Sequence, residues 1–141
     1  MKIEDIQDKF IGLVKKLDFK GVNVKVKEDP KLTIAHVKFK LNKIRKNVLD
    51  CELLIGRDFK KYPVKEEKFL GHELGHLLFF RDNFYIATLV HLIGLPYRKS
   101  NYGMITVIPL VFYLIEEGCA NLKAGQYGLK APTAEDYLSF Y

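Results

Sequence analysis

The chain has 141 residues, of which 48 % are hydrophobic, and a formal net charge of +6. This length suits a single domain, and the grouping of apolar residues into runs excludes an intrinsically disordered chain. The basic residues are dispersed over the first half without the aromatic and glycine pattern of a nucleic-acid-binding module, so we expect no nucleic-acid partner. The two cysteines, Cys51 and Cys119, lie far apart, which excludes a disulfide framework. Because the acidic, amphipathic residues 1–6 are not typical of a secretory signal, we expect a cytoplasmic protein with both thiols buried and reduced.

The first half of the chain alternates between helical and strand patterns. Apolar residues at helical spacing over 3–17 predict an amphipathic helix. Alternation of apolar and polar residues over 22–27 and 32–41 predicts two strands, and the segment 48–55, closed by Gly56, predicts a third.

The second half begins with a helix that we expect to open at Pro63 and to run to about Arg81. Two apolar runs follow, over 84–97 and 102–115, and each has 14 residues. A membrane-crossing helix needs about 20, so we expect no stable membrane span and predict that both runs cover the preceding helix and form the core. The second run should break at Pro109 and then continue as a helix.

These elements predict an α+β fold in which a small three-stranded sheet packs on the helix 63–81, with further helices in the C-terminal half. We expect one domain over residues 1–141. Residues 126–141 are a tail punctuated by glycine and proline, with one short helix predicted after Thr133.

The segment 72–76, His-Glu-Leu-Gly-His, carries the clearest chemical signal. Histidines four residues apart project from one face of a helix, about 6 Å apart along its axis, and can bind one metal ion. Glu73 flanks that face, where its carboxylate could take a proton from a zinc-activated water during amide hydrolysis. Gly71 and Gly75 are poor helix formers, which indicates that something must approach this helix closely.

A catalytic zinc ion usually has three protein ligands, and Glu117 is the strongest third candidate. It follows His76 by 41 residues, and Asn121 lies four residues further on, on the same helical face. The Asn121 amide could therefore orient a liganding histidine. Glu116 is the competing ligand, but its neighbour on the same face is Ala120, which cannot orient anything. The alternative for both glutamates is a solvated helix start after an apolar run.

Small residues near these glutamates predict that two helices pack closely, since Gly118 and Ala120 leave room for a neighbour. The remaining histidines are weaker ligand candidates. His91 lies in an apolar run, where a hydrogen-bonded core histidine is the commoner role, and His36 lies on a predicted strand. The third histidine of the metzincin pattern would fall at position 82, which is Asp82.

The segments 72–76 and 117–121, His-Glu-Leu-Gly-His and Glu-Gly-Cys-Ala-Asn, resemble the paired motifs of the gluzincin class of zinc metallopeptidases. Over residues 1–125 the size and element order are similar to those of the archaeal minigluzincins, which are soluble counterparts of integral-membrane metallopeptidase domains. The Glu-x-x-Ala-Asn stretch together with Ala124 is also similar to the ImmA/IrrE regulatory peptidases.

This resemblance implies a minimal zincin-like metallopeptidase domain that acts as an endopeptidase on peptide or protein substrates. By the resemblance, His72, His76 and Glu117 would bind one catalytic Zn²⁺, and Glu73 would serve as general base and acid. Asn121 stands where the wider class commonly has an aspartate, and it would contact a metal ligand.

The resemblance also implies a role for the tail, because minigluzincins are held inactive by their C-terminal residues. Residues 137–141 are aromatic enough to fill a cleft, although a terminal helix docked on the core is the equal alternative. A substrate would pair with a strand edge, either 32–41 or 48–55. Candidates for an oxyanion-stabilising group are Tyr85, His91, Tyr97, Arg98 and Tyr102.

Two other functions compete with the peptidase. One is a zinc-binding regulatory or structural protein with little turnover, for which Glu73 would be unnecessary. The other is a protein whose apolar runs form a membrane-associating hairpin over 84–115.

Overall fold

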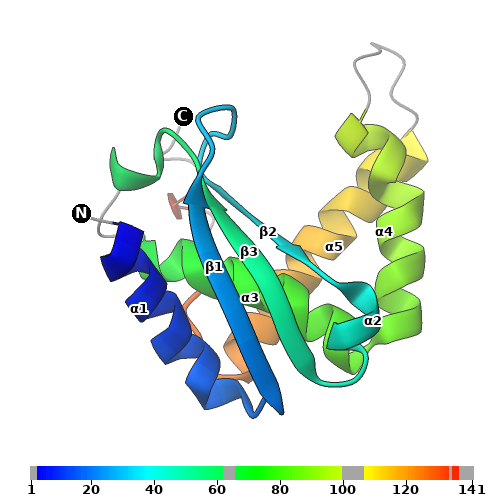
Figure 1. Ribbon diagram of the computed structural model, residues 1–141. Coiled ribbons are helices and arrows are strands. Elements are labelled where there is room, and N and C mark those ends of the chain that lie inside the picture. The colour runs from blue at the N-terminus through cyan, green and yellow to red at the C-terminus, as the bar shows by residue number, and fades with distance from the viewer. Residues whose placement is uncertain (1–2, 62–65, 100–106, 134, 137–141) are drawn as a thin grey trace.

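The computed structural model describes residues 3–61, 66–99, 107–133 and 135–136. The chain has an α+β fold with a three-stranded mixed sheet and several helices (Figure 1), so the predicted fold class and number of strands are confirmed. The elements, in chain order, are α1 (Ile3–Val14), η1 (Lys15–Leu17), β1 (Gly21–Glu28), β2 (Ala35–Phe39), α2 (Leu41–Ile44), β3 (Val48–Ile55), η2 (Phe59–Lys61), α3 (Glu66–Asp82), α4 (Phe84–Lys99) and α5 (Val107–Gln126). Within the described ranges, no helix is both long and apolar enough to cross a bilayer.

The sheet has β3 at its centre, paired in parallel with β1 and antiparallel with β2. β2 is shorter than the predicted 32–41, because residues 30–34 form turns and bends instead. The Gly56 N–H donates a hydrogen bond to the Ile34 carbonyl oxygen at 2.6 Å, which fastens this segment beside the end of β3. A Cβ at position 56 would lie 2.6 Å from the Thr33 carbonyl carbon, so only glycine fits there.

One face of the sheet is apolar and the other is charged. The helices α1 and α3 touch each other and the sheet, and together they cover its apolar face (Figure 1). Large side chains that are fully buried between these layers are Ile6, Phe10, Leu49, Leu53, Leu70, Leu74, Leu77 and Leu78. On the opposite face, Asp50 pairs with Lys43 at 2.8 Å and Glu52 with Lys27 at 2.7 Å. Part of the lysine excess therefore lies on a solvated sheet face.

The described parts of the two apolar runs, 84–97 and 107–115, do not fill the core, contrary to the prediction. They lie in α4 and α5, which pack along each other beside the sheet (Figure 1) and, as predicted, contact α3. The buried hydrophobic side chains described on α4 are only Ala87 and Val90. The core is filled mainly by α1, α3 and β3 instead, which leaves many of the described apolar side chains of the two runs exposed.

Helix α5 runs through Pro109 without the predicted break. Pro109 is the third residue of the helix, where the backbone N–H has no partner within the helix. The missing proline N–H therefore removes no hydrogen bond.

After α5 the chain turns at Gly128, which has a φ of 73°, and then passes beside α3. The Lys130 carbonyl oxygen lies so close to Gly71 that a Cβ at this glycine would overlap it. The close approach predicted at Gly71 is therefore confirmed. Of the short helix predicted after Thr133, residues 135–136 are helical, and 137–141 lie outside the described residues.

Candidate metal centre

Helix α3 presents His72 and His76 on successive turns of one face. Their rings meet edge to face with centroids 4.7 Å apart, and the two Nε2 atoms are separated by 3.1 Å. His72 is only 8 % exposed, because the apolar residues around it pack into the core. Both imidazoles therefore direct a nitrogen toward the same point.

Helix α5 brings Glu117 to that point. Its Oε2 lies 2.7 Å from His72 Nε2, and its Oε1 lies 3.4 Å from His76 Nε2. The two helices can approach so closely because a Cβ at Gly75 would overlap the Ala120 carbonyl oxygen, and Ala120 is itself fully buried. The close approach that Gly75 and Ala120 predict is thus confirmed.

Gly118 does not contribute to this packing, and its predicted role is wrong. A Cβ at Gly118 would meet nothing within 4 Å, and the residue is exposed. The physical reason is rotation about the helix axis. Two residues correspond to about 200° on an α-helix, so Gly118 and Ala120 lie on nearly opposite sides of α5.

The three donors fit a tetrahedral metal ion. Ligands about 2.0–2.1 Å from zinc in a tetrahedral arrangement lie about 3.3 Å from one another. Here the two histidine Nε2 atoms are 3.1 Å apart, and the two oxygens of Glu117 lie near them, Oε2 at 2.7 Å from His72 Nε2 and Oε1 at 3.4 Å from His76 Nε2. His72, His76 and Glu117 could therefore hold a metal ion. Two imidazole nitrogens and one carboxylate are also the donor set of one class of catalytic zinc sites, which keep a fourth position open.

Asn121 lies next to this group, one turn after Glu117 on α5. Its Oδ1 is 2.6 Å from His72 Nδ1, so the ring N–H donates to the amide oxygen. This hydrogen bond fixes the orientation of the imidazole and directs Nε2 toward Glu117 and His76. The structure therefore brings all four of these predicted residues together.

The histidine and carboxylate groups shift each other's pKa. Burial lowers the pKa of His72, but the hydrogen bond to Glu117 and the charges of Glu73 and Glu117 outweigh it, so its pKa is raised. Burial raises the pKa of Glu117, yet hydrogen bonds from His72 and His76 bring the net pKa well below its usual range. Glu117 is therefore ionised at neutral pH, which is the form that binds a metal.

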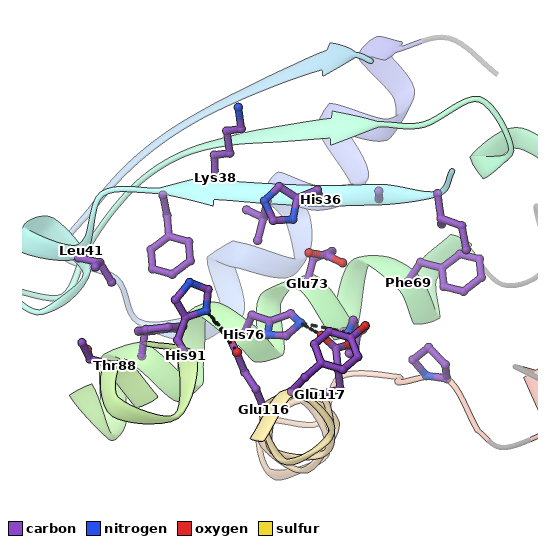
Figure 2. A pocket seen from close by; sticks show the side chains of 18 of the residues that line it. His36, Lys38, Leu41, Phe69, Glu73, His76, Thr88, His91, Glu116 and Glu117 are labelled. Atoms are coloured by element: carbon purple, nitrogen blue, oxygen red, sulfur yellow. Dashed lines mark hydrogen bonds and ion pairs between the residues drawn. The ribbon is translucent and has the colours of Figure 1, made fainter. Parts of the chain in front are cut away.

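The three residues lie in a cleft of about 700 Å³ between α3, α5, α4 and β2. Its lining includes the consecutive residues 34–39, so the whole of β2 borders it. Glu73 also lines the cleft, and Figure 2 shows its side chain extending from α3 toward β2. The carboxylate expected to act as a base thus faces the same space as the potential metal ligands. Pro132 from the C-terminal segment completes one end.

A second pair of a histidine and a carboxylate, His91 and Glu116, lies at the other side of the cleft (Figure 2). His91 Nδ1 lies 3.0 and 3.2 Å from the two oxygens of Glu116. Glu116 is only 2 % exposed, so the solvated helix start considered for it is wrong. The His91 side chain is 36 % exposed and borders the cleft, so it is hydrogen-bonded but not a core residue. Sequence reasoning missed the pair, although the one histidine in a long uncharged run was a signal for a buried carboxylate partner.

Other side chains considered for oxyanion stabilisation lie elsewhere. Tyr85 is 72 % exposed and accepts a hydrogen bond from Arg45 at 2.5 Å. The Tyr97 ring packs against Tyr113 in a tilted arrangement with ring centroids 4.8 Å apart. Tyr102 and the side chain of Arg98 lie outside what the structure describes. Among those candidates, the described cleft lining includes His91 alone.

The chain matches no protein-family model, and no curated protein or solved structure is significantly similar to it. The geometry of this site is therefore what any functional conclusion must rest on.

Proposed function

We propose that this protein is a zinc-dependent metallopeptidase of the gluzincin type, with a zincin-like fold. One observation carries the proposal. Two histidines from α3 and a carboxylate from α5 converge with separations suited to a tetrahedral ion, and Glu73 faces the same cleft. A purely structural metal site is closed and has no use for an additional carboxylate beside the ion.

The roles of the side chains follow from their positions. Zinc bound to His72, His76 and Glu117 would supply Lewis acidity toward a peptide carbonyl and toward water. The Glu73 carboxylate would accept a proton from the attacking water and deliver it to the leaving amine nitrogen. His91, oriented by its bond to Glu116, is our candidate donor to the developing oxyanion.

The substrate would bind along β2. This strand has only one partner in the described sheet, and it borders the cleft over its whole length. An extended peptide could add to its free edge through backbone hydrogen bonds, which favours peptide and protein substrates. The alternative strand, 48–55, is β3, which is paired on both sides and has no edge to offer.

The proposal includes a possible latent state, in which the tail covers the cleft. It is supported by Pro132, which lines the cleft, and by the 2.9 Å ion pair that ties Asp136 to Lys68 on α3. A chain ending at Gly128 should then cleave peptides faster than the full chain. Because this truncation also removes the buried Leu129, a second chain ending at Thr133 controls for loss of stability. Equal, low activity in all three folded, zinc-loaded proteins would contradict latency.

The decisive experiment compares peptide cleavage and metal content in one set of variants. Glu73→Gln should keep stoichiometric zinc but lose activity by about 10²–10⁴-fold, because it removes only the proton acceptor. Glu67→Gln, on the same helix but paired with Lys130 at 3.4 Å, is the matched control and should change neither property. Glu117→Ala should lose zinc.

Two outcomes would contradict the proposal. If Glu117→Ala binds zinc as tightly as wild type, the ligand set is wrong. If wild type and the truncated chains bind zinc but cleave no peptide in a broad library, the regulatory or structural zinc protein is the better description.

A further inference from the structure

Helix α4 exposes an apolar face to solvent. Tyr85, Ile86, Leu89 and Leu92 recur at helical spacing, and their exposed fractions range from 58 % to 72 %. On the opposite face, Ala87 and Val90 are buried. A helix that is apolar on both faces is expected inside a larger core or against lipid, not in water.

The first half of α5 repeats this pattern. Its exposed hydrophobic residues are 42–71 % accessible, and they are Val107, Ile108, Val111, Leu114 and Ile115. We call the two stretches together, α4 and residues 107–115 of α5, the apolar hairpin. An apolar surface made of so many neighbouring side chains marks an interaction site in a soluble protein.

The formal charges within the sequence of the apolar hairpin are all positive. Between Asp82 and Glu116 the sequence contains no acidic residue, and its only formal charges there are Arg98 and Lys99 at the end of α4. At the beginning of α4, the Arg45 guanidinium lies 5.2 Å from the ring centroid of Tyr85 and donates to its hydroxyl. An uncharged surface flanked by cations and an amphipathic tyrosine is typical of segments that lie in the interface of a bilayer.

A second copy of the chain is a less suitable occupant. Two hairpins packed on each other would bring their basic ends into an interface to which the segment contributes no carboxylate. The flanking acids are already engaged, since Glu116 is buried against His91 and Asp82 pairs with Arg81 at 2.9 Å. Anionic lipid headgroups would supply the missing negative charge.

We propose that the apolar hairpin docks this protein on the surface of an anionic lipid bilayer. The exposed aliphatic side chains enter the boundary between headgroups and acyl chains, while Arg45 meets lipid phosphates. The cleft would then open near the membrane, because Leu92 and Tyr113 of the same helices line it. This inference does not depend on the proposed enzymatic activity.

Vesicle flotation without detergent tests the proposal. Wild type should float with vesicles of phosphatidylcholine and phosphatidylserine, and much less with phosphatidylcholine alone or at high salt. The double variant Leu89→Asp/Ile108→Asp should reduce the partition coefficient by about tenfold or more, because two inserted aliphatic groups are lost. Arg45→Gln should reduce the preference for phosphatidylserine.

The matched control is Val22→Asp/Leu122→Asp, which changes the net charge equally. Val22 lies on β1, at the opposite sheet edge, and Leu122 lies on the second half of α5, with exposed fractions of 48 % and 68 %. This control should keep the wild-type partition coefficient within about twofold, since neither side chain belongs to the apolar hairpin. Thermal unfolding verifies that each variant is folded.

Three results would overturn the proposal. Folded wild type could fail to float with anionic vesicles at low salt. The hairpin variant could bind as well as wild type. Sedimentation equilibrium in buffer could reveal a stable dimer that Leu89→Asp/Ile108→Asp dissociates, in which case a second copy covers the surface.

Discussion

The body of the molecule, residues 3–82, and the apolar hairpin place similar side chains in opposite environments. Leu74 on α3 is fully buried under the sheet, whereas Leu89 on α4 is 58 % exposed. Both lie in helices rich in leucine, yet α3 has a sheet to cover, whereas α4 packs mainly along α5 and touches α3 only lightly. Hydrophobicity therefore indicates that a segment needs a partner, but it does not reveal whether that partner lies within the chain.

The largest effects that we expect test this difference in stability. Leu74→Ala should lower the free energy of unfolding by about 2–5 kcal/mol, because it leaves a cavity in the core. Leu89→Ala should change it by no more than about 0.5 kcal/mol. Urea denaturation of wild type and both variants measures the two changes in the free energy of unfolding. Comparable losses in the two would mean that the hairpin belongs to the core.

The next prediction concerns a contribution of the apolar hairpin to the proposed peptide hydrolysis. If His91 donates to the oxyanion, His91→Ala should reduce kcat by about 10²–10³-fold while zinc content stays unchanged. Thr88→Ala is the control, since Thr88 lines the cleft from the same helix but bonds to the Phe84 carbonyl. If kcat falls by the same small factor in both variants, a group other than His91 stabilises the oxyanion.

Local patterns were sufficient to predict much of the body. Alternation of apolar and polar residues predicted strands, and the four-residue spacing of His72 and His76 predicted that they share a helical face. Pairing Glu117 with Asn121 relied on the same periodicity, and the structure brings all of these side chains together. These inferences concern one element at a time, where geometry follows from the sequence interval.

What the sequence could not reveal depends on how elements pack. Gly118 was expected at a helix contact because it is small, but its direction around α5 was decided by the position of α3. The burial of Glu116 could not be predicted, because the sequence does not reveal that α4 places His91 against it. Whether 84–115 fills a core also depended on how much apolar surface the rest of the chain left uncovered.

A third prediction concerns the contact between α3 and α5, where body and hairpin helices join. Gly75→Ala should destabilise the fold by about 1–3 kcal/mol, because the added methyl overlaps the Ala120 carbonyl. It should also weaken zinc binding, since Glu117 would be moved away from the histidines. Gly118→Ala, with free space around it, should instead stabilise by up to about 1 kcal/mol through helix propensity. Thermal melts with and without zinc measure the stability of both variants. If Gly75→Ala and Gly118→Ala change the stability in the same direction, the close packing of α3 on α5 at Gly75 is refuted.

A fourth, smaller effect is expected from the residue that orients His72. Asn121→Ala should lower zinc affinity by about 10–100-fold, because the imidazole loses its hydrogen-bond acceptor. Leu122→Ala, next in the chain and 68 % exposed, should leave the affinity unchanged. Competition with a chelator of known affinity gives both values. An unchanged affinity in Asn121→Ala would show that the rigid helix alone orients the ring.

The smallest effect concerns the tail, which is fastened to the body. The Thr133 backbone N–H and the Lys68 ammonium group lower the pKa of Asp136 to about 2. Because the folded pKa lies below the unfolded one, this carboxylate stabilises the fold above about pH 4. The contribution disappears as the pH falls from about 4 to about 2. Asp136→Asn should therefore melt slightly below wild type at neutral pH and together with it near pH 2.

Glu135→Gln controls for the removal of one negative charge and should melt like wild type throughout. A constant gap between Asp136→Asn and wild type at every pH would mean that the asparagine perturbs the turn at Thr133 and that the charge of Asp136 is not what holds the tail.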